Sequence, residues 1–559
     1  MATNPFQFAK NQHSRWLPNW LMNNMTRVKV GRRASLENRM CRGSGRRARE
    51  AGGRIKPGAQ APGKPNKNGV EPAERATAHR EMKLPNKAHA HSPAIAGSDA
   101  LFLILTWGLR PRLYSAARFA GSALEALGSR LALPVLLLLC ITFVTFAQQP
   151  ARDISKQPAR PARDWVRDGV IYEIYPRAFS QKGDLNAVTA RLDELKKLGV
   201  TILWLMPIHP IGQEKKKGTI GSPYAVRDYY AINPDYGTAG DLKRLVREAH
   251  ARGLKVIIDV VANHTSWDSV LMKHPEFYKR DAQGNITYPH DWYDIAALDY
   301  NNQQLRRYMT DMLKYWIREF DLDGFRCDVA AEVPTDFWEN ARRELEQVKP
   351  DIVMLAEAHK AELMVSAFDL DYSWPLHSAL TNVLQGRAPA SDLRKEWEKE
   401  VQEWPRGALH MRFSDNHDER RAIARFGERA ALAASAFVFT LDGVPMIYNG
   451  MEVGDTTESG APALFEKLPI FWPIAERRKD FPQFYEQIMA QRRASNALRR
   501  GTLEWLRNSD EARVVTFVRR AGNEAVLVAI NFSNRPFTGS VQAQKLSLDV
   551  WEYKIISHR

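Results

Sequence analysis

Residues 324–332, which read GFRCDVAAE, place a guanidinium and a carboxylate two positions apart inside an apolar segment. Side chains alternate along a strand, so Arg326 and Asp328 would share one face. A cation fixed beside a carboxylate keeps it ionised and oriented, as a nucleophile requires. The pattern therefore has two interpretations: Asp328 is a nucleophile, or the two residues form a buried ion pair that braces the core.

Three further stretches also end an apolar run in acidic residues, histidine or both, and they favour the first interpretation. They read DVVANHTS from Asp259, DIVMLAEAH from Asp351 and FSDNHD from Phe413. In this order and spacing, the four stretches closely resemble the four sequence regions of the α-amylase superfamily, glycoside hydrolase family thirteen. The resemblance covers residues 165–559. One motif alone would be weak evidence for the resemblance, whereas four motifs in the same order are specific evidence.

The resemblance implies a role for each acidic residue in these motifs. Asp328 would attack the anomeric carbon of a sugar, and Glu357 would be the general acid. Asp418 would grip sugar hydroxyls and stabilise an oxocarbenium-like transition state. The apolar flanks of Glu357 and the neighbouring carboxylates favour its protonated form. Asp259 is expected to be structural and to brace Arg326 from the third strand.

The same resemblance implies four substrate-binding residues. His264 and His417 match histidines that bind hydroxyls of one sugar ring, and Arg326 would hold the nucleophile. Tyr224 lies four residues before Asp228 and matches a tyrosine that stacks on the sugar. A lone histidine is more often a core residue, so it is the NH and NHD contexts that favour a binding role.

Two features depart from the family pattern. Many α-amylases carry Lys-His shortly after the nucleophile, whereas residues 329–332 here read VAAE, closer to neopullulanases, cyclomaltodextrinases and small maltooligosaccharide enzymes. Asn263 matches the family's calcium-ligand asparagine, yet Ala296 or Ala297 stands where a partner aspartate is expected. Calcium needs several oxygen ligands, and one amide is not enough. We therefore expect no cofactor, with Asn263 as a ligand if calcium is bound.

The elements that must position these residues alternate between strand and helix from Trp165 onward. Strands are expected at residues 169–175, 200–206, 255–261, 324–329, 352–356, 367–372, 410–414 and 444–448. Helices are clearest at residues 185–198, 239–251 and 303–320. Eight strands alternating with helices predict an α/β fold, a (β/α)8 TIM barrel over residues 165–500, with catalytic groups at the carboxyl ends of the strands.

Two segments interrupt or follow this alternation. Residues 267–302, between the third strand and its helix, are too long for an ordinary βα loop and are rich in aromatic residues. The resemblance identifies them as a short domain B insertion over the cleft, where Trp292 and Tyr293 would add stacking. Residues 501–559 turn to alternating strands, which predicts a compact C-terminal all-β sandwich.

The amino-terminal part has a different composition. Residues 1–150 hold 23 Lys and Arg against 7 Asp and Glu, so they carry the whole net charge of +16. The charges of the remaining residues balance, which argues against a nucleic-acid partner.

We expect residues 1–130 to be a disordered basic leader, with the true start further downstream. Residues 131–147 are apolar and read as a signal-peptide h-region cleaved after Ala147, which predicts export, or as a membrane anchor. Residues 148–164 would be a linker.

Three functions follow from these observations. The first is a retaining hydrolase of α-1,4-glucosidic bonds, with starch-derived maltooligosaccharides or longer α-glucans as its substrate partners. The second is a transglycosylase that uses the same residues but passes the glycosyl unit to another sugar. The third is a catalytically silent, membrane-anchored ectodomain, but such relatives lose the carboxylates that this chain keeps at Asp328, Glu357 and Asp418. The motifs do not distinguish endo from exo action.

Overall fold

The computed structural model describes residues 153–558. The expected leader at residues 1–130 and the apolar segment at 131–147 lie outside the described residues. Within residues 153–558, no helix is both long enough and apolar enough to cross a membrane.

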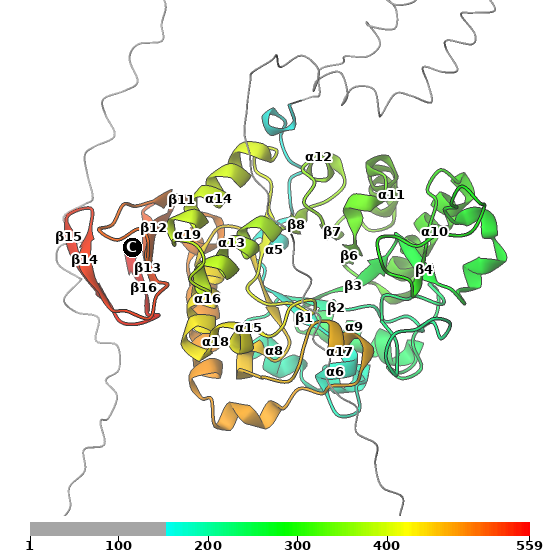
Figure 1. The fold of residues 1–559 in the computed structure, drawn as a ribbon, viewed down its shortest axis with the longest axis horizontal. Coiled ribbons are helices and arrows are strands. Elements are labelled where there is room, and N and C mark those ends of the chain that lie inside the picture. Colours follow the sequence, from blue (N-terminus) through cyan, green and yellow to red (C-terminus); the bar gives the residue numbers. More distant parts are fainter. Residues whose placement is uncertain (1–152, 559) are drawn as a thin grey trace, which may run out of the picture. The chain divides into compact units, whose positions relative to one another are not determined.

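Eight parallel strands close into a barrel at the centre of this part of the chain (Figure 1). Their order around the barrel is β1, β10, β9, β8, β7, β6, β3 and β2. The strands are β1 (Ile171–Ile174), β2 (Ile202–Leu205), β3 (Lys255–Val261), β6 (Gly324–Asp328), β7 (Val353–Ala356), β8 (Leu370–Tyr372), β9 (His410–Arg412) and β10 (Val444–Tyr448). Apart from Lys255, every residue of these strands is buried, which explains their continuous apolar runs. The predicted (β/α)8 barrel is confirmed.

Helices follow the strands and cover the outside of the barrel (Figure 1). The longer ones are α9 (Ala239–Ala251), α10 (Gln303–Phe320), α11 (Thr335–Val348), α13 (Trp374–Leu384), α14 (Ser391–Glu403), α16 (Glu428–Thr440) and α18 (Asp480–Ala494). The shorter ones are α5 (Asp164–Arg167), α6 (Pro176–Phe179), α7 (Leu185–Ala190), α8 (Leu192–Leu198), α12 (Leu363–Ser366), α15 (Ala422–Phe426), α17 (Ala461–Phe465) and α19 (Asn496–Arg500). Two of the expected helices, α9 and α10, have the predicted bounds.

The single helix expected over residues 185–198 is instead two helices, α7 and α8. Arg191 separates them, with φ of −104° and ψ of 9°. Its guanidinium lies 3.6 Å from the centre of the Trp472 ring and 2.8 Å from a Glu194 oxygen. The contact with Trp472, which is distant in sequence, accompanies this break and could not be predicted from a periodic apolar pattern.

Gly324 allows β6 to approach β7 closely. Its φ is 148°, and a Cβ added there would lie 1.9 Å from the carbonyl oxygen of Val353. Only glycine fits this position. The same strand pairs with β3 so that Arg326 stands opposite Asp259, which sets the arginine of the first motif beside its expected brace.

Domain B, residues 267–302, leaves the barrel between β3 and α10. It contains the 3-10 helices η2 (Val270–Lys273) and η3 (Pro275–Phe277). Its last strand, β5 (Ile295–Ala297), pairs antiparallel with β4 (His264–Ser266), so that Ala297 lies opposite His264. This pairing connects domain B to the end of β3, where the motif DVVANHTS lies.

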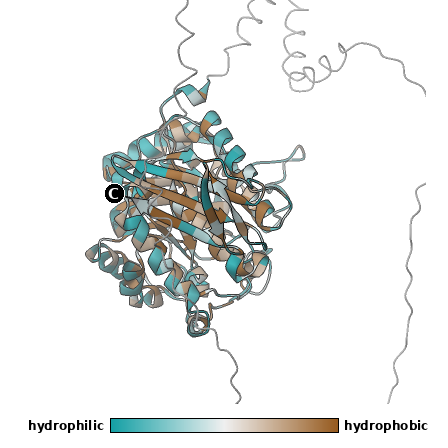
Figure 2. Ribbon diagram, turned by 90° about the vertical axis from the view of Figure 1, so that its left-hand side faces the viewer, coloured by the Kyte–Doolittle hydropathy of each residue, from teal (hydrophilic) through white to brown (hydrophobic). Residues whose placement is uncertain are grey.

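The chain ends in two antiparallel sheets that share a core. One sheet contains β11 (Thr502–Trp505), β12 (Val514–Ala521), β13 (Glu524–Asn531) and β16 (Tyr553–His558), and the other contains β14 (Phe537–Val541) and β15 (Gln544–Leu548). Hydrophobic and hydrophilic residues intermingle along the strands in Figure 2, and buried residues of both sheets, including Leu527 and Phe537, form one cluster. The predicted C-terminal β-sandwich is confirmed. It contacts the barrel through Arg519, which donates to the carbonyl of Thr440 at 2.9 Å.

Residues 153–163, expected to be part of a linker, lie against the barrel domain. They include the 3-10 helix η1 (Ile154–Lys156). The backbone N–H of Ala159 donates to the carbonyl of Arg406 at 2.9 Å, and that of Arg160 donates to the carbonyl of Met364 at 2.8 Å. The linker composition gave no signal of these contacts, because they are made by backbone groups.

Candidate active site

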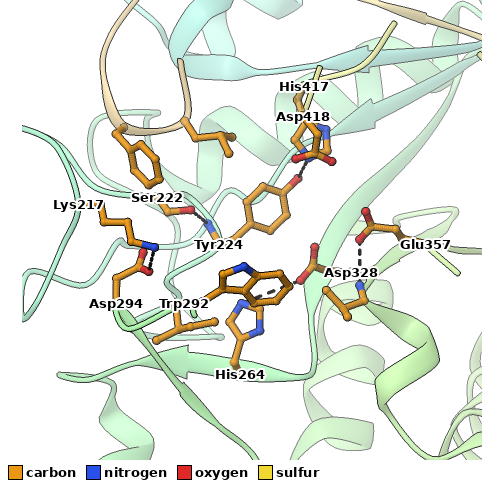
Figure 3. A pocket seen from close by; sticks show the side chains of 14 residues that line it. Lys217, Ser222, Tyr224, His264, Trp292, Asp294, Asp328, Glu357, His417 and Asp418 are labelled. Carbon is orange, nitrogen blue, oxygen red and sulfur yellow. Dashed lines mark hydrogen bonds and ion pairs between the residues drawn. The ribbon is translucent and has the colours of Figure 1, made fainter. Parts of the chain in front are cut away.

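The seven expected site residues come together at the carboxyl ends of the barrel strands. Six of them line a cavity of about 320 Å³, and Arg326 lies fully buried beside it (Figure 3). The cavity is lined by Lys217, Ser222, Tyr224, His264, Trp292, Asp294, Ile295, Asp328, Val329, Glu357, His417, Asp418, Leu464 and Phe465. Asp328 ends β6 and Glu357 directly follows β7, so neighbouring strands deliver two carboxylates to one place.

Arg326 connects three carboxylates. Its Nη1 donates to both oxygens of Asp259 at 2.9 Å and to Oδ1 of Asp328, also at 2.9 Å. Its Nη2 lies 2.7 Å from Oε2 of Glu357. The guanidinium carbon lies 5.2 Å from the centre of the Trp204 ring, whose π face favours a cation. Asp259 thus braces Arg326 as expected.

One buried guanidinium cannot neutralise three carboxylates, and this excess of negative charge adds to the effect of burial. Burial raises the pKa of Glu357 to about 7, the charge of Arg326 opposes the shift, and the charge of Asp328 adds to it. Burial likewise raises the pKa of Asp328 to about 6, again against the effect of Arg326. Both pKa values are therefore raised, and the raised pKa of Glu357 favours the protonated form that a general acid needs.

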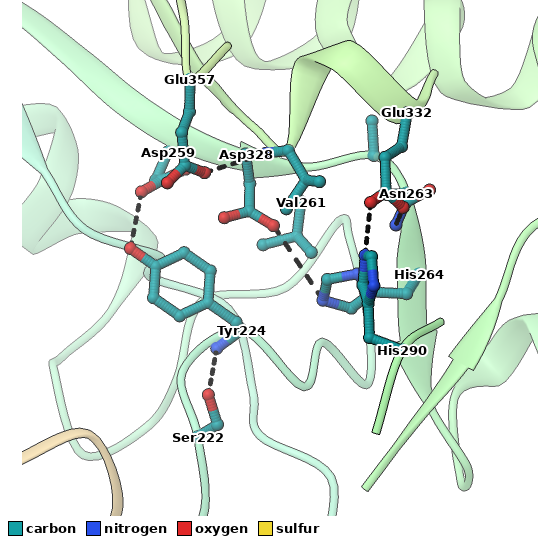
Figure 4. A network of polar contacts seen from close by, with 12 residues as sticks. Ser222, Tyr224, Asp259, Val261, Asn263, His264, His290, Asp328, Glu332 and Glu357 are labelled. Atoms are coloured by element: carbon teal, nitrogen blue, oxygen red, sulfur yellow. Dashed lines mark hydrogen bonds and ion pairs between the residues drawn. The ribbon is translucent and has the colours of Figure 1, made fainter. Parts of the chain in front are cut away.

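Two buried polar atoms at the cavity have no hydrogen-bond partner among residues 153–558. They are Oδ2 of Asp328 and Nδ1 of His264. Figure 4 shows the Asp328 carboxylate directed towards His264, whose Nε2 lies 4.0 Å from Oδ2. Burial lowers the pKa of His264 to about 3, so this ring is neutral. Buried polar groups normally have partners, so these atoms are suited to a polar ligand.

His417 links the other wall of the cavity to the first strand. Its Nδ1 lies 2.5 Å from Glu173, and its Nε2 lies 2.7 Å from the Tyr224 hydroxyl and 3.3 Å from Asp418. Burial lowers the pKa of His417, but the charges of Asp418 and Glu173 outweigh this and raise it to about 9. The Tyr224 hydroxyl in turn donates to Asp259 at 3.1 Å. A cationic His417 therefore positions both Tyr224 and Asp418.

Two functional residues were missed by sequence reasoning. Glu173 is fully buried in β1, and its signal was an acidic residue inside the apolar run IYEI. Val329 has φ of 43°, a left-handed conformation that is strained for a β-branched residue. In this conformation its N–H donates to Oε2 of Glu357 at 3.0 Å. Nothing in the sequence VAAE indicates such a turn.

The Asn263 side chain contacts a carboxylate near domain B. Its amide nitrogen donates to Oε2 of Glu332 at 3.1 Å, and Oε1 of Glu332 lies 2.5 Å from Nε2 of His290 (Figure 4). Ala296 is fully buried in β5 and offers no side-chain oxygen. In the described part of the chain, no three His, Cys, Asp or Glu side chains are grouped to hold a metal ion. Hydrogen bonds connect domain B to the barrel at this point.

Known proteins resemble this chain across the barrel and the C-terminal sheets. The family model described as "Alpha amylase, catalytic domain" matches residues 173–296 and 281–515. The solved structure of an alpha-amylase from Lactobacillus plantarum is 31% identical, covers 71% of this chain and all of its own, and has a TM-score of 0.63. That of a noncanonic maltogenic alpha-amylase from Thermotoga neapolitana is 32% identical, with coverage of 70% and 97% and a TM-score of 0.62. A cyclomaltodextrinase from Geobacillus thermopakistaniensis is 29% identical over 67% of this chain and 70% of its own.

Proposed function

Because this chain belongs to the α-amylase family of glycoside hydrolases, we propose that it hydrolyses α-1,4-glucosidic bonds of starch-derived maltooligosaccharides with retention of the α-anomer. The observation that carries this proposal is the contact of one guanidinium, that of Arg326, with both Asp328 and Glu357. Carboxylates held by one guanidinium are closely spaced. Such spacing is compatible with the retaining arrangement, in which the two carboxyl groups lie about 5 to 5.5 Å apart.

The first chemical step breaks the glycosidic bond. Oδ2 of Asp328, which has no hydrogen-bond partner among the described residues, attacks the anomeric carbon of the sugar. The bond between that carbon and the glycosidic oxygen breaks, and Glu357 gives its proton to the departing oxygen. The products are a shortened chain with a free hydroxyl and a glycosyl ester on Asp328.

The second step returns the enzyme to its starting state. Glu357, now a carboxylate, removes a proton from a water molecule, and the oxygen of that water attacks the anomeric carbon. The ester bond breaks and Asp328 leaves as a carboxylate. Two inversions at one carbon give net retention. A sugar hydroxyl in place of water would give a transglycosylation product instead.

The remaining site residues bind the sugar that reacts. The ring of Tyr224 presents an apolar face for stacking, and it is fixed by hydrogen bonds to Asp259 and His417. His264 and His417 face the cavity and would contact hydroxyls. Asp418 would bind hydroxyls more strongly as positive charge develops in the transition state.

We expect soluble maltooligosaccharides to be preferred to starch granules. Domain B is short and, as the sequence suggested, a Lys-His pair is missing after the nucleophile, so few groups contact a long chain. Relatives named cyclomaltodextrinase, intracellular maltogenic amylase and neopullulanase support this choice of substrate. Comparing kcat/KM for maltotriose to maltoheptaose, soluble amylose, pullulan and raw granules tests it. Strong granule adsorption with poor oligosaccharide turnover would contradict it.

The mechanism is tested by following maltoheptaose hydrolysis with proton NMR from the first seconds. The expected initial product has a new reducing end in the α form, which then mutarotates. Initial release of the β-anomer would refute the retaining mechanism. Products longer than the substrate, formed in excess over hydrolysis products, would make the chain a transglycosylase.

We also propose that the enzyme is exported, because residues 131–147 form an uninterrupted apolar segment followed by Gln148, Gln149 and Pro150. Mass spectrometry of the native protein should then find its first residue near Gln148. Peptides from residues 1–120 in the exported material would contradict this.

A further inference from the structure

Glu173 is an acidic residue inside the apolar strand β1, and its side chain contacts His417, which lines the cavity. Side chains alternate along a strand, so Tyr172, the preceding residue, lies on the opposite face of β1 and donates to Glu452. Glu173 has no exposed surface. A carboxylate removed from water is costly unless a group of opposite charge lies beside it. The partner of Glu173 inside the barrel therefore explains its position.

His417 is the hydrogen-bond partner of this carboxyl group. Its Nδ1 lies 2.5 Å from Oε1 of Glu173, whereas Oε2 of Glu173 has no hydrogen-bond partner among residues 153–558. The two residues come from β1 and from the loop after β9, which are far apart along the chain. The ring of His417 is buried as well. Within the described part of the chain, the Glu173 carboxyl group therefore acts on His417.

The hydrogen bonds of Tyr224 indicate which nitrogen of His417 carries a proton. The Tyr224 hydroxyl has one proton, which it donates to Oδ2 of Asp259 at 3.1 Å. Both oxygens of Asp259 accept from Arg326, so Asp259 is an acceptor here. The 2.7 Å contact between the Tyr224 hydroxyl and Nε2 of His417 then requires a proton on Nε2 (Figure 3). The same N–H faces Asp418 at 3.3 Å.

With a proton on Nε2, the ring of His417 can face Glu173 in two ways. Either Nδ1 is protonated too and an imidazolium faces a carboxylate, or the proton between them lies on Glu173 and the ring is neutral. Burial lowers the pKa of His417, but the charges of Asp418 and Glu173 raise it to about 9. Burial raises the pKa of Glu173, and the charge of His417 opposes that shift. The imidazolium–carboxylate pair is therefore the form at neutral pH.

The charge on His417 depends on few groups. Other ionisable residues around the pair are Asp259, Arg326, Tyr372, Asp415 and Tyr448. Arg326 is the cation among them, and it lowers the pKa of His417. Asp418 and Glu173 supply the two largest effects that raise this pKa. Of these two, Asp418 lines the cavity and Glu173 does not.

We infer that Glu173 is a positioning residue: its buried carboxylate keeps His417 doubly protonated, so that the Nε2–H of this ring holds Asp418 at the reacting sugar. The same N–H fixes the Tyr224 hydroxyl. This inference rests on the proposed function, since it takes Asp418 as the group that binds sugar hydroxyls in the transition state. It adds a residue that lies in none of the four motifs and does not line the cavity.

The test uses Glu173→Gln in the full chain, which keeps the side-chain volume and removes the charge. With maltoheptaose, kcat should fall by about 10- to 100-fold while KM changes by less than about threefold, because Asp418 acts mainly in the transition state. The loss of kcat relative to the wild type should be at least about threefold larger at pH 8 than at pH 6, because His417 regains its second proton in acid. Unchanged kinetics, or an equal loss at both pH values, would overturn the inference. A wild-type protein without turnover would instead refute the proposed function.

A second readout does not depend on turnover. In protein labelled with 15N-histidine, the NMR signals of His417 are those absent from His417→Gln. Their titration midpoint should lie near pH 9 in the wild type and should fall by at least about one pH unit in Glu173→Gln. An unchanged midpoint in the folded variant would overturn the inference, whatever the activity of that variant.

Two further variants separate charge from packing. Glu173→Asp keeps the charge on a shorter side chain, so its kcat and its His417 midpoint should lie between those of the wild type and of Glu173→Gln. A folded Glu173→Asp with a kcat at or below that of Glu173→Gln would overturn the role of the charge. Glu452→Gln is the matched control, because Glu452 is buried, bonds to Tyr172 and does not line the cavity. It should leave kcat and the His417 signals unchanged, and an equal loss of kcat in it would overturn the assignment to Glu173.

Discussion

Two arginines of the barrel strands, Arg326 and Arg412, each contact more than one carboxylate, but their surroundings differ. Arg412 in β9 pairs with Glu400 at 2.5 Å and with Asp442 at 2.9 Å. In that cluster every carboxylate oxygen has a donor: Ser373 donates to the second Glu400 oxygen at 2.9 Å, and Trp397 donates to both Asp442 oxygens at 3.0 Å. In the Arg326 cluster, Oδ2 of Asp328 has none among the described residues.

The pKa shifts of the two clusters have opposite signs. Burial acts to raise the pKa of Glu400 and of Asp442, but the charge of Arg412, together with other nearby cations and hydrogen bonds, outweighs burial and both pKa values are lowered. At Asp328 and Glu357, burial and like charges prevail and the pKa values are raised. An arginine among carboxylates therefore does not identify a catalytic site. An excess of carboxylates with one oxygen left open to a cavity does.

Of the changes considered, Asp328→Asn should have the largest effect on kcat. The amide is nearly isosteric but cannot attack, so kcat should fall by at least about 10,000-fold. The melting temperature should stay the same or rise, because one of three crowded negative charges is removed. Circular dichroism and kcat on maltoheptaose check both. Turnover within about tenfold of the wild type, in a folded protein, would remove Asp328 from the nucleophile role.

The matching change in the structural cluster is Arg412→Met. It removes the arginine from the buried carboxylate of Glu400 and the partly exposed carboxylate of Asp442, so the free energy of unfolding should fall by about 3 to 5 kcal/mol, mainly because of Glu400. The kcat of the folded fraction should be unchanged. Urea unfolding and active-site-normalised rates measure the two effects. A selective loss of kcat with normal stability would show that the two clusters are not distinct in function.

The pH dependence of kcat/KM should be bell-shaped, with a maximum between about 6 and 7. Activity rises as pH increases through about 6 because Asp328 must be ionised, and falls above about 7 because Glu357 must hold its proton. Since both folded-state pKa values exceed those of the unfolded chain, these groups stabilise the fold most in acid, and that stability is lost as pH rises through 6 to 7. A profile flat from pH 5 to 9 would contradict the shifts.

Chelation of metal ions by EDTA should have the smallest effect on kcat and on the melting temperature. If hydrogen bonds of Glu332 with Asn263 and His290 connect domain B to the barrel, chelation should change neither kcat nor the melting temperature. Differential scanning fluorimetry with EDTA, and then with added calcium, measures this. A large drop that calcium restores would identify oxygen ligands other than those around Asn263.

Much of the fold followed from local pattern. The bounds of β3, β10, α9 and α10 match the expected ones, because buried strands and amphipathic helices leave periodic signals. The break between α7 and α8 at Arg191 was not predicted, and Arg191 contacts Trp472, which is distant in sequence. The strand expected at residues 367–372 was also predicted too long. Only Leu370–Tyr372 forms a strand, and Ala367 caps α12.

The site was foreseen as a set of residues but not as an arrangement. The motifs identified Asp328, Glu357 and Asp418, and the structure places all three on one cavity. The sequence could not show that Glu173 supports His417 across the barrel, because β1 and the loop after β9 are far apart along the chain.

Val329 has a consequence for efforts to make this protein more heat-resistant. Its left-handed backbone at φ 43° costs roughly 1 to 3 kcal/mol, which a glycine at the same position would largely avoid. Selection for heat tolerance alone would therefore favour Val329→Gly. A glycine would also make the backbone more flexible at the residue that follows the nucleophile and donates to Glu357. Among variants selected for heat tolerance, those with the highest melting temperatures should therefore include some with a lowered kcat.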